Sequence, residues 1–319
     1  MTPMTDTKPV LLSGVKPTGR PHLGNYFGAM KQFVELQKEY ESFVFLADYH
    51  ALNFIQNASE MREHTLGVAI DYLAIGLDPA DVTLFKQSDV PAHTELAWIF
   101  DTITTMPYLQ RSHAYKDAEA KGKEVSVGTF NYPMLMAADI LLYDPDIVPV
   151  GQDQKQHVEF ARDTAEKFNR TFGDTFKLPD AKIQETVAVV PGIDGQKMSK
   201  SYGNTVELFA PREEIQRRVM SIVTDSSGER PEHVYAIHRL FKTEEELAPF
   251  YDEHRGKYKD LKDALIEDID TFVEPLRNRR AEIAADESRV FEILKEGGEK
   301  ARERSEAKMR DVRQKIGVD

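Results

Sequence analysis

The sequence contains no cysteine, and this absence excludes several kinds of site. Without thiols the protein has no disulfide, no thiolate-ligated zinc or iron–sulfur centre and no thiol nucleophile. This composition fits a reducing compartment. Histidines and carboxylates also form no cluster with the spacing of metal ligands, so no metal site of the protein's own is predicted.

Long apolar runs are absent as well. No window approaches the roughly 18 continuous apolar residues of a membrane span, and Met1–Lys8 lacks the apolar segment of a secretory signal. We therefore expect a cytoplasmic protein that does not contact membranes. The net charge of −13 argues against indiscriminate binding of nucleic acid, DNA included, because attraction to phosphate depends on lysine and arginine. A local basic face remains compatible with that charge.

The 319 residues are 41% hydrophobic and 30% charged, which suffices for one large globular domain and a smaller one. Short apolar runs alternate with helical patterns in the first two thirds of the chain. This rhythm is typical of an α/β fold with a parallel sheet. The expected strands are Pro9–Val15, Ser42–Tyr49, Val82–Lys86, Ile147–Val150 and Thr186–Val190, and the clearest helices are Gly28–Tyr40, Ser59–Gly76 and Asp153–Phe172.

The pattern changes after Gly203-Asn204. From Pro211 onward no strand is expected, and apolar residues recur at helical spacing. This predicts an α/β domain in residues 1–208 and an all-helical domain in residues 209–319. The helical patterns are Ile215–Val223, Tyr235–Phe241, Leu261–Leu276 and Val290–Ile316, with breaks expected at Ser226-Ser227-Gly228, Arg255-Gly256 and Gly297-Gly298.

The segment His22-Leu23-Gly24-Asn25, here called the first signature, follows an apolar run and precedes a helical pattern. Such strand-to-helix junctions bind phosphate in α/β folds. Gly24 lets a ligand lie against the backbone, while His22 and Asn25 supply directed hydrogen bonds. The loop Lys16–Pro21 would hold the segment in shape. Taken alone, these four residues more often form a solvated turn with a surface histidine.

The segment Lys197-Met198-Ser199-Lys200-Ser201, the second signature, places two lysines and two serines on a short loop. Taken alone, such a loop is usually a solvent-facing turn. Nucleotidyl transfer spreads negative charge over phosphate oxygens, and ammonium groups can close on that charge in the transition state. We expect Asp194-Gly195 and Gly203-Asn204, on either side, to leave the loop able to move.

In this order, each after a strand-like run, the two signatures resemble the paired motifs of class I aminoacyl-tRNA synthetases. Nearly the whole chain is similar to one family of that class, the bacterial tryptophanyl-tRNA synthetases. The resemblance implies a Rossmann-like doubly wound sheet, Mg²⁺-assisted activation of L-tryptophan by ATP, and transfer to tRNA(Trp). It also implies a homodimer. The segments that carry it are Gly24–Ala29, Leu46–Ala51, Tyr132–Tyr143 and Val148–His157.

At the nucleotide, the resemblance implies catalytic roles for His22, Asn25, Lys197 and Lys200. No protein ligand to a metal is implied, and Mg²⁺ is expected to arrive with ATP. Two positions depart from the usual pattern: Asn25 replaces a histidine, and Lys16 stands where many relatives have glutamine. The residues expected to bind ATP are Gly14, Lys16, Thr18, His22, Gly24, Asn25, Gly151, Asp153, Lys197, Met198, Ser199, Lys200 and Ser201.

Asp139 lies in the otherwise apolar stretch Met134–Leu142, where a buried carboxylate needs a partner. It could cap a helix or pair with a lysine; the resemblance implies that it accepts the indole N–H of tryptophan. Met136, one helical turn away, favours tryptophan over tyrosine because tyrosyl relatives usually carry glutamine there. Met136 could equally fill the core. The other residues expected at tryptophan are His50, Tyr132 and Gln154.

The helical domain is expected to bind the anticodon, where unpaired bases are accessible. Its basic residues, none assigned to a contact, are Arg212, Arg217, Arg218, Arg239, Arg277, Arg279 and Arg280. Lys116, Lys121 and Lys123 form either a lid over phosphate or a solvated charge run. Ala97–Met106 is either a dimer surface or a core helix. Three alternatives stay open: the tyrosyl sibling, a regulatory relative without catalysis, and a cofactor adenylyltransferase.

Overall fold

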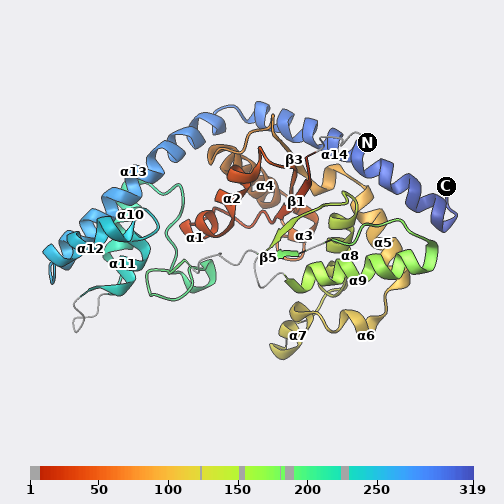
Figure 1. The fold of residues 1–319 in the computed structure, drawn as a ribbon, viewed down its shortest axis with the longest axis horizontal. Coiled ribbons are helices and arrows are strands. Elements are labelled where there is room, and N and C mark those ends of the chain that lie inside the picture. Colours follow the sequence, from red (N-terminus) through yellow and green to blue (C-terminus); the bar gives the residue numbers. More distant parts are fainter. Residues whose placement is uncertain (1–7, 123, 151–154, 180, 184–189, 224–229) are drawn as a thin grey trace, which may run out of the picture.

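The computed structural model describes residues 8–122, 124–150, 155–179, 181–183, 190–223 and 230–319. A parallel sheet lies at its centre, and two long helices arch over it (Figure 1). Among the described residues, none of the helices combines the length and apolar character needed to cross a membrane.

The sheet has the strand order of a Rossmann-like fold. Strands β1 (Val10–Val15), β2 (Glu41–Leu46) and β3 (Val82–Lys86) pair in parallel in that order, as do β4 (Val148–Val150) and β5 (Ala181–Ile183). The amide of Leu12 donates to the carbonyl of Ile147 at 3.1 Å, and a parallel bridge joins Ile147 to Leu11. The order is therefore β3-β2-β1-β4-β5, which reverses between β1 and β4.

Helices cover both faces of this sheet, as the alternation of strand side chains requires. Leu11, Val44 and Leu84 pack with α4 (Ala58–Ala74) and α13 (Tyr258–Ala284) on one face. Leu12 and Phe85 pack on the other face with α5 (Ala92–Ile103), α8 (Val127–Leu141) and α9 (Lys155–Phe172). The predicted doubly wound α/β fold is confirmed.

Strands β1 to β4 lie close to four of the expected runs. Residues 186–189 of the fifth run lie outside the described residues, and β5 was not predicted. The prediction of a helix over Gly28–Tyr40 was wrong at its first residue, because helical structure already begins at Leu23. It runs as α1 (Leu23–Asn25), a π-helical turn η1 (Tyr26–Met30) and α2 (Lys31–Leu36). The shorter elements are α3 (Asp48–Ala51), η2 (Gln87–Asp89), α6 (Met106–Leu109), α7 (His113–Ala120) and η4 (Lys200–Tyr202).

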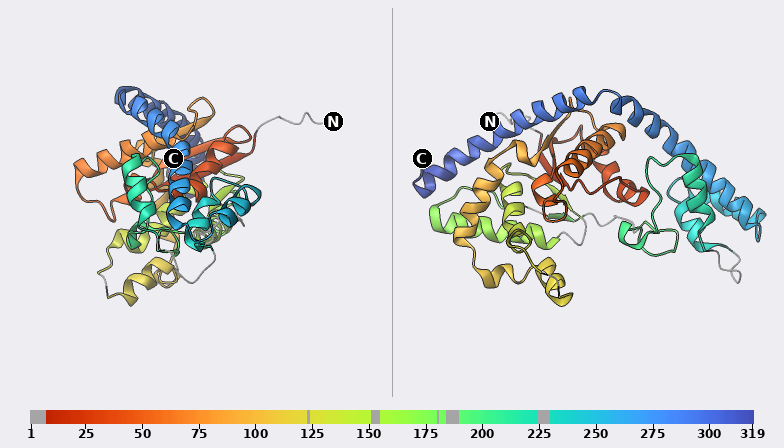
Figure 2. Two further views of the ribbon diagram at one scale, coloured as in Figure 1. Left: turned by 90° about the vertical axis from the view of Figure 1, so that its left-hand side faces the viewer. Right: turned by 180° about the vertical axis from the view of Figure 1, so that it is seen from behind.

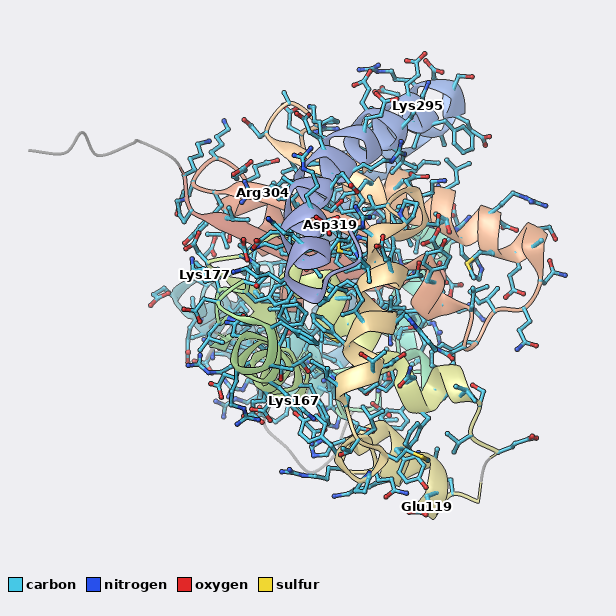
Figure 3. All side chains as sticks on the ribbon, turned by 90° about the vertical axis from the view of Figure 1, so that its right-hand side faces the viewer. Glu119, Lys167, Lys177, Lys295, Arg304 and Asp319 are labelled. Atoms are coloured by element: carbon cyan, nitrogen blue, oxygen red, sulfur yellow. The ribbon has the colours of Figure 1, made fainter. Side chains whose placement is uncertain are left out.

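The part after Pro211 is helical, but its last helix leaves the others. Helices α10 (Arg212–Met220), α11 (Glu232–His238) and α12 (Glu244–Glu253) gather with α13 at one end of the molecule (Figure 1). Helix α14 (Glu287–Ile316) runs back across the sheet, as the view from behind shows (Figure 2). Seen from the end where Asp319 lies, α14 with Lys295 is opposite α7 with Glu119 (Figure 3).

The expected break at Gly297-Gly298 is wrong, because both glycines lie inside α14. A Cβ atom at Gly297 would lie 1.9 Å from the carbonyl oxygen of Leu84 in β3. The glycine therefore serves the close approach of helix to edge strand rather than a turn. Since α14 covers β3, the edge of the sheet is protected from pairing with another chain.

Replacing Gly297 by alanine should destabilise the protein by about 3 kcal/mol, because α14 must move away from the β3 backbone. Gly67, in the interior of α4, is the matched control, since a Cβ there would meet nothing within 4 Å. Gly67→Ala should be neutral or stabilise by up to about 1 kcal/mol. Urea unfolding of the two variants measures the difference, and equal stabilities would contradict this account of α14.

Candidate functional site

A cavity of about 800 Å³ opens at the carboxyl ends of β1 and β4, where the strand order reverses. Ligands of open α/β sheets bind at such a switch point. The cavity has two polar ends. One carries the predicted nucleotide residues Gly14, Lys16, Thr18, His22, Asn25, Ser199 and Lys200, and the other carries His50, Tyr132, Met136 and Asp139.

The first signature begins helix α1 with a reciprocal cap. The backbone N–H of Asn25 donates to Nδ1 of His22 at 3.2 Å, and the backbone N–H of His22 donates to Oδ1 of Asn25 at 3.1 Å. Since Nδ1 accepts, the neutral imidazole carries its proton on Nε2. Burial, with a smaller effect of the Lys200 charge, lowers the pKa of His22 to about 4. At neutral pH His22 is therefore an uncharged donor at the cavity wall.

This lowered pKa gives a pH-dependent stability. Between the folded pKa of about 4 and the ordinary 6.5, the unfolded chain binds more protons at His22 than the folded protein does. The stabilising contribution is therefore complete above about pH 6.5 and is lost as the pH falls toward 4. Between pH 7 and 4.5 the loss should reach about 2 kcal/mol. Urea unfolding of His22→Gln and of the unchanged protein across this pH range measures the loss. If the free energy of unfolding depended equally on pH in both proteins, the assignment of the loss to His22 would be contradicted.

The two signatures touch each other, although they lie far apart in the sequence. The backbone N–H of Gly24 donates to Sδ of Met198 at 3.3 Å, and Nζ of Lys200 donates to the carbonyl of Thr18 at 2.9 Å. Met198 is buried behind the first signature. Gly24, Met198, Lys197 and Ser201 do not line the cavity, and Lys197 and Ser201 are exposed.

Asn204, expected to loosen the second signature, holds it instead. Its buried side chain donates to Oδ1 of Asp194 at 2.7 Å and to the carbonyl of Lys197 at 3.1 Å. Its Oδ1 accepts from the backbone N–H of Ser199 at 2.7 Å. These bonds fix the loop backbone while leaving the lysine side chains unconstrained by Asn204. The Asp194 and Asn204 pair on either side of the loop was the available sequence signal.

Asp139 lies at the other end of the cavity and is 1% exposed. Its side chain neither caps a helix nor pairs with a lysine. Nε2 of His50 lies 2.9 Å from Oδ2, while Nδ1 of His93 and Nε2 of Gln87 lie 2.6 and 2.7 Å from Oδ1. Burial alone would raise the pKa of Asp139, but the hydrogen bonds from both histidines lower it to about 2. The group is therefore a buried, charged carboxylate.

A carboxylate has about four acceptor positions, and three are taken by these donors. The remaining position is on Oδ2, so Asp139 can accept one more N–H or O–H from a ligand. Sequence reasoning missed Gln87 and His93, which come from η2 and α5. The signal in the sequence was a histidine on the otherwise apolar buried face of α5.

The ring of Tyr132 stands between two histidines, with ring centroids 6.3 Å from His50 and 5.4 Å from His157. Its hydroxyl lies 3.4 Å from Nε2 of His157, and burial raises its pKa to about 12. Met136 lines the cavity and also packs against the core. The predicted residues Gly151, Asp153 and Gln154 lie outside the described residues.

The two predicted lid lysines within the described residues do not line the cavity. Lys116 is exposed and Lys121 pairs with Asp117 at 2.7 Å, while Lys123 lies outside the described residues. Most of the arginines considered for the anticodon pair with acidic residues of their own region. The ion pairs are Arg212 with Glu267 and Asp270, Arg217 and Arg218 with Glu214, Arg239 with Glu244, and Arg277 with Asp270.

Arg280 differs from these arginines because it pairs with a cavity residue. Its Nε donates to Oδ1 of Asp71 at 2.5 Å, and Asp71 lies on α4 and lines the cavity. Burial raises the pKa of Asp71, against the opposing effect of Arg280. Sequence reasoning missed Asp71, although a carboxylate inside an apolar helical pattern is the same signal that singled out Asp139.

The family model described as "tRNA synthetases class I (W and Y)" matches residues 4–289. The chain belongs to this family of class I tRNA synthetases. The resemblance found in the sequence is thereby confirmed.

Two relatives of this synthetase are named Tryptophan--tRNA ligase. The one from Fusobacterium nucleatum is 45% identical over 96% of this chain and 97% of its own length. The one from Rhodopirellula baltica is 45% identical over 97% of this chain and 99% of its own length. A crystal structure of the Campylobacter jejuni tryptophanyl-tRNA synthetase complexed with ADP and tryptophan superposes with a TM-score of 0.91 at 42% identity, covering 97% of this chain and 99% of that one.

Proposed function

We propose that this synthetase activates L-tryptophan with ATP and transfers the tryptophanyl group to tRNA(Trp). The observation that carries the proposal is one cavity lined both by residues of the two signatures and by a buried carboxylate, Asp139. Relatives named Tryptophan--tRNA ligase at 45% identity, and a related structure that holds ADP and tryptophan, support the choice of substrates.

In the first step a carboxylate oxygen of tryptophan attacks the α-phosphorus of ATP, and the bond to the bridging oxygen of diphosphate breaks. No side chain acts as a nucleophile, so the protein contributes positioning and charge stabilisation. His22 donates from Nε2 and Asn25 from its amide, both without charge. Lys197 and Lys200 supply positive charge to the phosphates; Lys200 starts at the cavity wall and Lys197 outside it.

In the second step a terminal ribose hydroxyl of the tRNA attacks the carbonyl carbon of tryptophanyl-adenylate. The bond from that carbon to the phosphate oxygen breaks, AMP leaves, and the hydroxyl proton passes to the departing phosphate. The amino acid stays in place through both steps if its indole N–H donates to the remaining acceptor position of Asp139. Phenylalanine would leave that position unpaired, which makes its binding costly.

Mg²⁺ is proposed to enter with ATP. The described residues contain no group of three His, Asp or Glu side chains placed to hold a metal ion, and Asp71 at the cavity is paired with Arg280. We propose that the phosphates of ATP, and no side chain, hold Mg²⁺. When bound, it neutralises charge on the phosphates, which is its usual role with nucleotides.

The helical region from residue 209 is proposed to bind the tRNA anticodon. In support, every strand of the described residues ends before residue 184, and α10 to α12 gather with α13 at one end of the molecule. Helix α14 belongs to residues 209–319 in sequence but packs on the sheet, so it is assigned to support the catalytic part. A cytoplasmic location is proposed because both substrates, ATP and tRNA, are found there.

The homodimer is proposed to form through α5 and α6. Within Ala97–Met106, Ile99 and Phe100 are buried, whereas Trp98 is 71% and Met106 65% exposed. Trp98 is the single tryptophan of the chain, so its fluorescence reports on this surface. Trp98→Glu should weaken the dimer by about 2 to 4 kcal/mol and halve the mass in solution at micromolar concentration. Phe291→Glu, on α14, is the matched control.

Dilution of the unchanged protein should shift the Trp98 emission to longer wavelength as the dimer dissociates, provided no free tryptophan is present. Analytical ultracentrifugation gives the mass directly. A Trp98→Glu protein that remains dimeric would contradict the assignment of this surface.

The proposed function is tested by charging tRNA. Purified protein is incubated with ATP, Mg²⁺, tRNA and labelled tryptophan, tyrosine or phenylalanine, and both aminoacyl-tRNA and AMP are measured. We expect tryptophanyl-tRNA and AMP in equal amounts. Charging with tyrosine alone would indicate the sibling activity, and no charging with any of the three would indicate a relative without catalysis.

A further inference from the structure

Phe54 is an aromatic side chain of the cavity wall that faces solvent. It is 71% exposed, yet it lines the cavity beside Asn53. Nζ of Lys16 lies 5.7 Å from the centre of its ring. The packing of the fold does not explain this ring, because neither of the two large core clusters contains it. An exposed ring with a lysine at its face is a suitable platform for a flat, negatively charged ligand.

The contacts around Phe54 place it between the two ends of the cavity. The side chain of Asn53 donates to the carbonyl of His50 at 3.4 Å and accepts from Oγ1 of Thr129 on α8 at 3.4 Å. This ties the segment to the elements that carry Asp139. Lys16, whose Nζ lies over the ring, begins the loop that leads to the first signature. Phe54 therefore lies next to residues that belong to both ends of the cavity.

The strand order separates Phe54 from the side of the cavity expected to hold the ribose of ATP. Phe54 follows β2 through α3, whereas the residues expected at that ribose, Gly151 and Asp153, follow β4 in the sequence. Strands β2 and β4 are neighbours of β1 on opposite sides. This geometry therefore does not favour stacking of the adenine of ATP on the ring of Phe54.

We propose that Phe54 stacks against the unpaired terminal base of the tRNA and that Lys16 attracts the adjoining phosphate. The base belongs to the nucleoside whose ribose hydroxyl attacks the adenylate, so stacking would bring that hydroxyl to the junction of the two cavity ends. Unpaired RNA bases are commonly bound by aromatic stacking. The inference rests on the proposed function, and it makes Phe54 a positioning residue for the second step alone.

The test separates the two steps in Phe54→Ala, Phe54→Tyr and the control Phe291→Ala, an exposed phenylalanine on α14. ATP–pyrophosphate exchange without tRNA should be unchanged within about 2-fold in all three. The kcat/KM for tRNA in charging should fall about 5- to 150-fold in Phe54→Ala, the range set by base stacking on an aromatic ring. Phe54→Tyr, which keeps a ring, should retain most of the activity, and Phe291→Ala all of it.

A second measurement identifies the base. A tRNA lacking its terminal nucleoside should inhibit the unchanged protein less well than an intact, non-chargeable tRNA, whereas both should inhibit Phe54→Ala equally. Normal charging by Phe54→Ala would overturn the inference. A raised KM for ATP in exchange would also overturn it, because the ring would then stack on the adenine of ATP. Absence of exchange in the unchanged protein would instead contradict the proposed function.

Discussion

Replacement of Asp139 by asparagine is expected to lower kcat/KM for tryptophan in ATP–pyrophosphate exchange by about 10³-fold. Removing one partner of a buried charged group costs about 3 to 5 kcal/mol, which is 10² to 10⁴ in rate or affinity. The side-chain amide of the introduced asparagine would also direct its own N–H groups at the donor groups of His50, His93 or Gln87. To avoid this repulsion the side chain would turn, and no acceptor would then be aimed at the indole N–H. The KM for ATP should change by no more than about 2-fold.

The matched control is Asp101→Asn, a partly buried carboxylate on α5 that accepts from the side chain of Asn131 and does not line the cavity. It should leave exchange nearly unchanged. Thermal unfolding of both variants separates a local effect from loss of fold. Equal losses in tryptophan and ATP use by Asp139→Asn would mean that Asp139 supports the structure and does not recognise the substrate.

Replacement of Lys200 by alanine should lower kcat of exchange by about 10² to 10³-fold, with binding of tryptophan unchanged. Loss of one preorganised group that stabilises developing charge has an effect of this size. Lys200 lines the cavity, and desolvation by burial lowers its pKa, against the opposing charges of Glu207 and Asp71. Lys200→Arg, which keeps the charge, should recover part of the rate.

Lys121→Ala is the control for charge, because Lys121 is exposed, pairs with Asp117 and does not line the cavity. Its exchange rate should match that of the unchanged protein. Single-turnover measurement of adenylate formation shows whether the Lys200 effect lies in chemistry. If Lys200→Ala raised the KM for ATP and left kcat unchanged, Lys200 would bind ATP without acting in the transition state.

Much of the fold was predictable, because the strands next to the site bury both faces and appear as short apolar runs. Strand β5 was missed because Ala181–Ile183 is too short to form such a run. The glycine pair in α14 was wrongly predicted to break the helix. Gly297 is needed because the helix lies against the backbone of Leu84, which is more than 200 positions earlier in the chain. Deleting the residues after Pro211 would also remove α14 from β3, so truncation does not isolate the role of the helical end.

The candidate site was predictable where a residue type conflicted with its surroundings or belonged to a signature. Asp139 is such a conflict, and the structure places it at the cavity. The sequence pointed to His50 at the same site, but the pairing of Asp139 with His50, Gln87 and His93 was not predictable, because these three residues come from separate elements and meet only in three dimensions. The pair of Asp71 and Arg280, 209 positions apart, was hidden for the same reason.

The central claim is that one cavity binds phosphate at the two signatures and an indole N–H at Asp139. Amino-acid-dependent ATP–pyrophosphate exchange with tryptophan, tyrosine and phenylalanine tests it most directly, because it requires both ends of the cavity and no tRNA. We expect rapid exchange with tryptophan and rates lower by at least about 10³-fold with the other two. Absence of exchange with tryptophan, or faster exchange with tyrosine, would contradict the account.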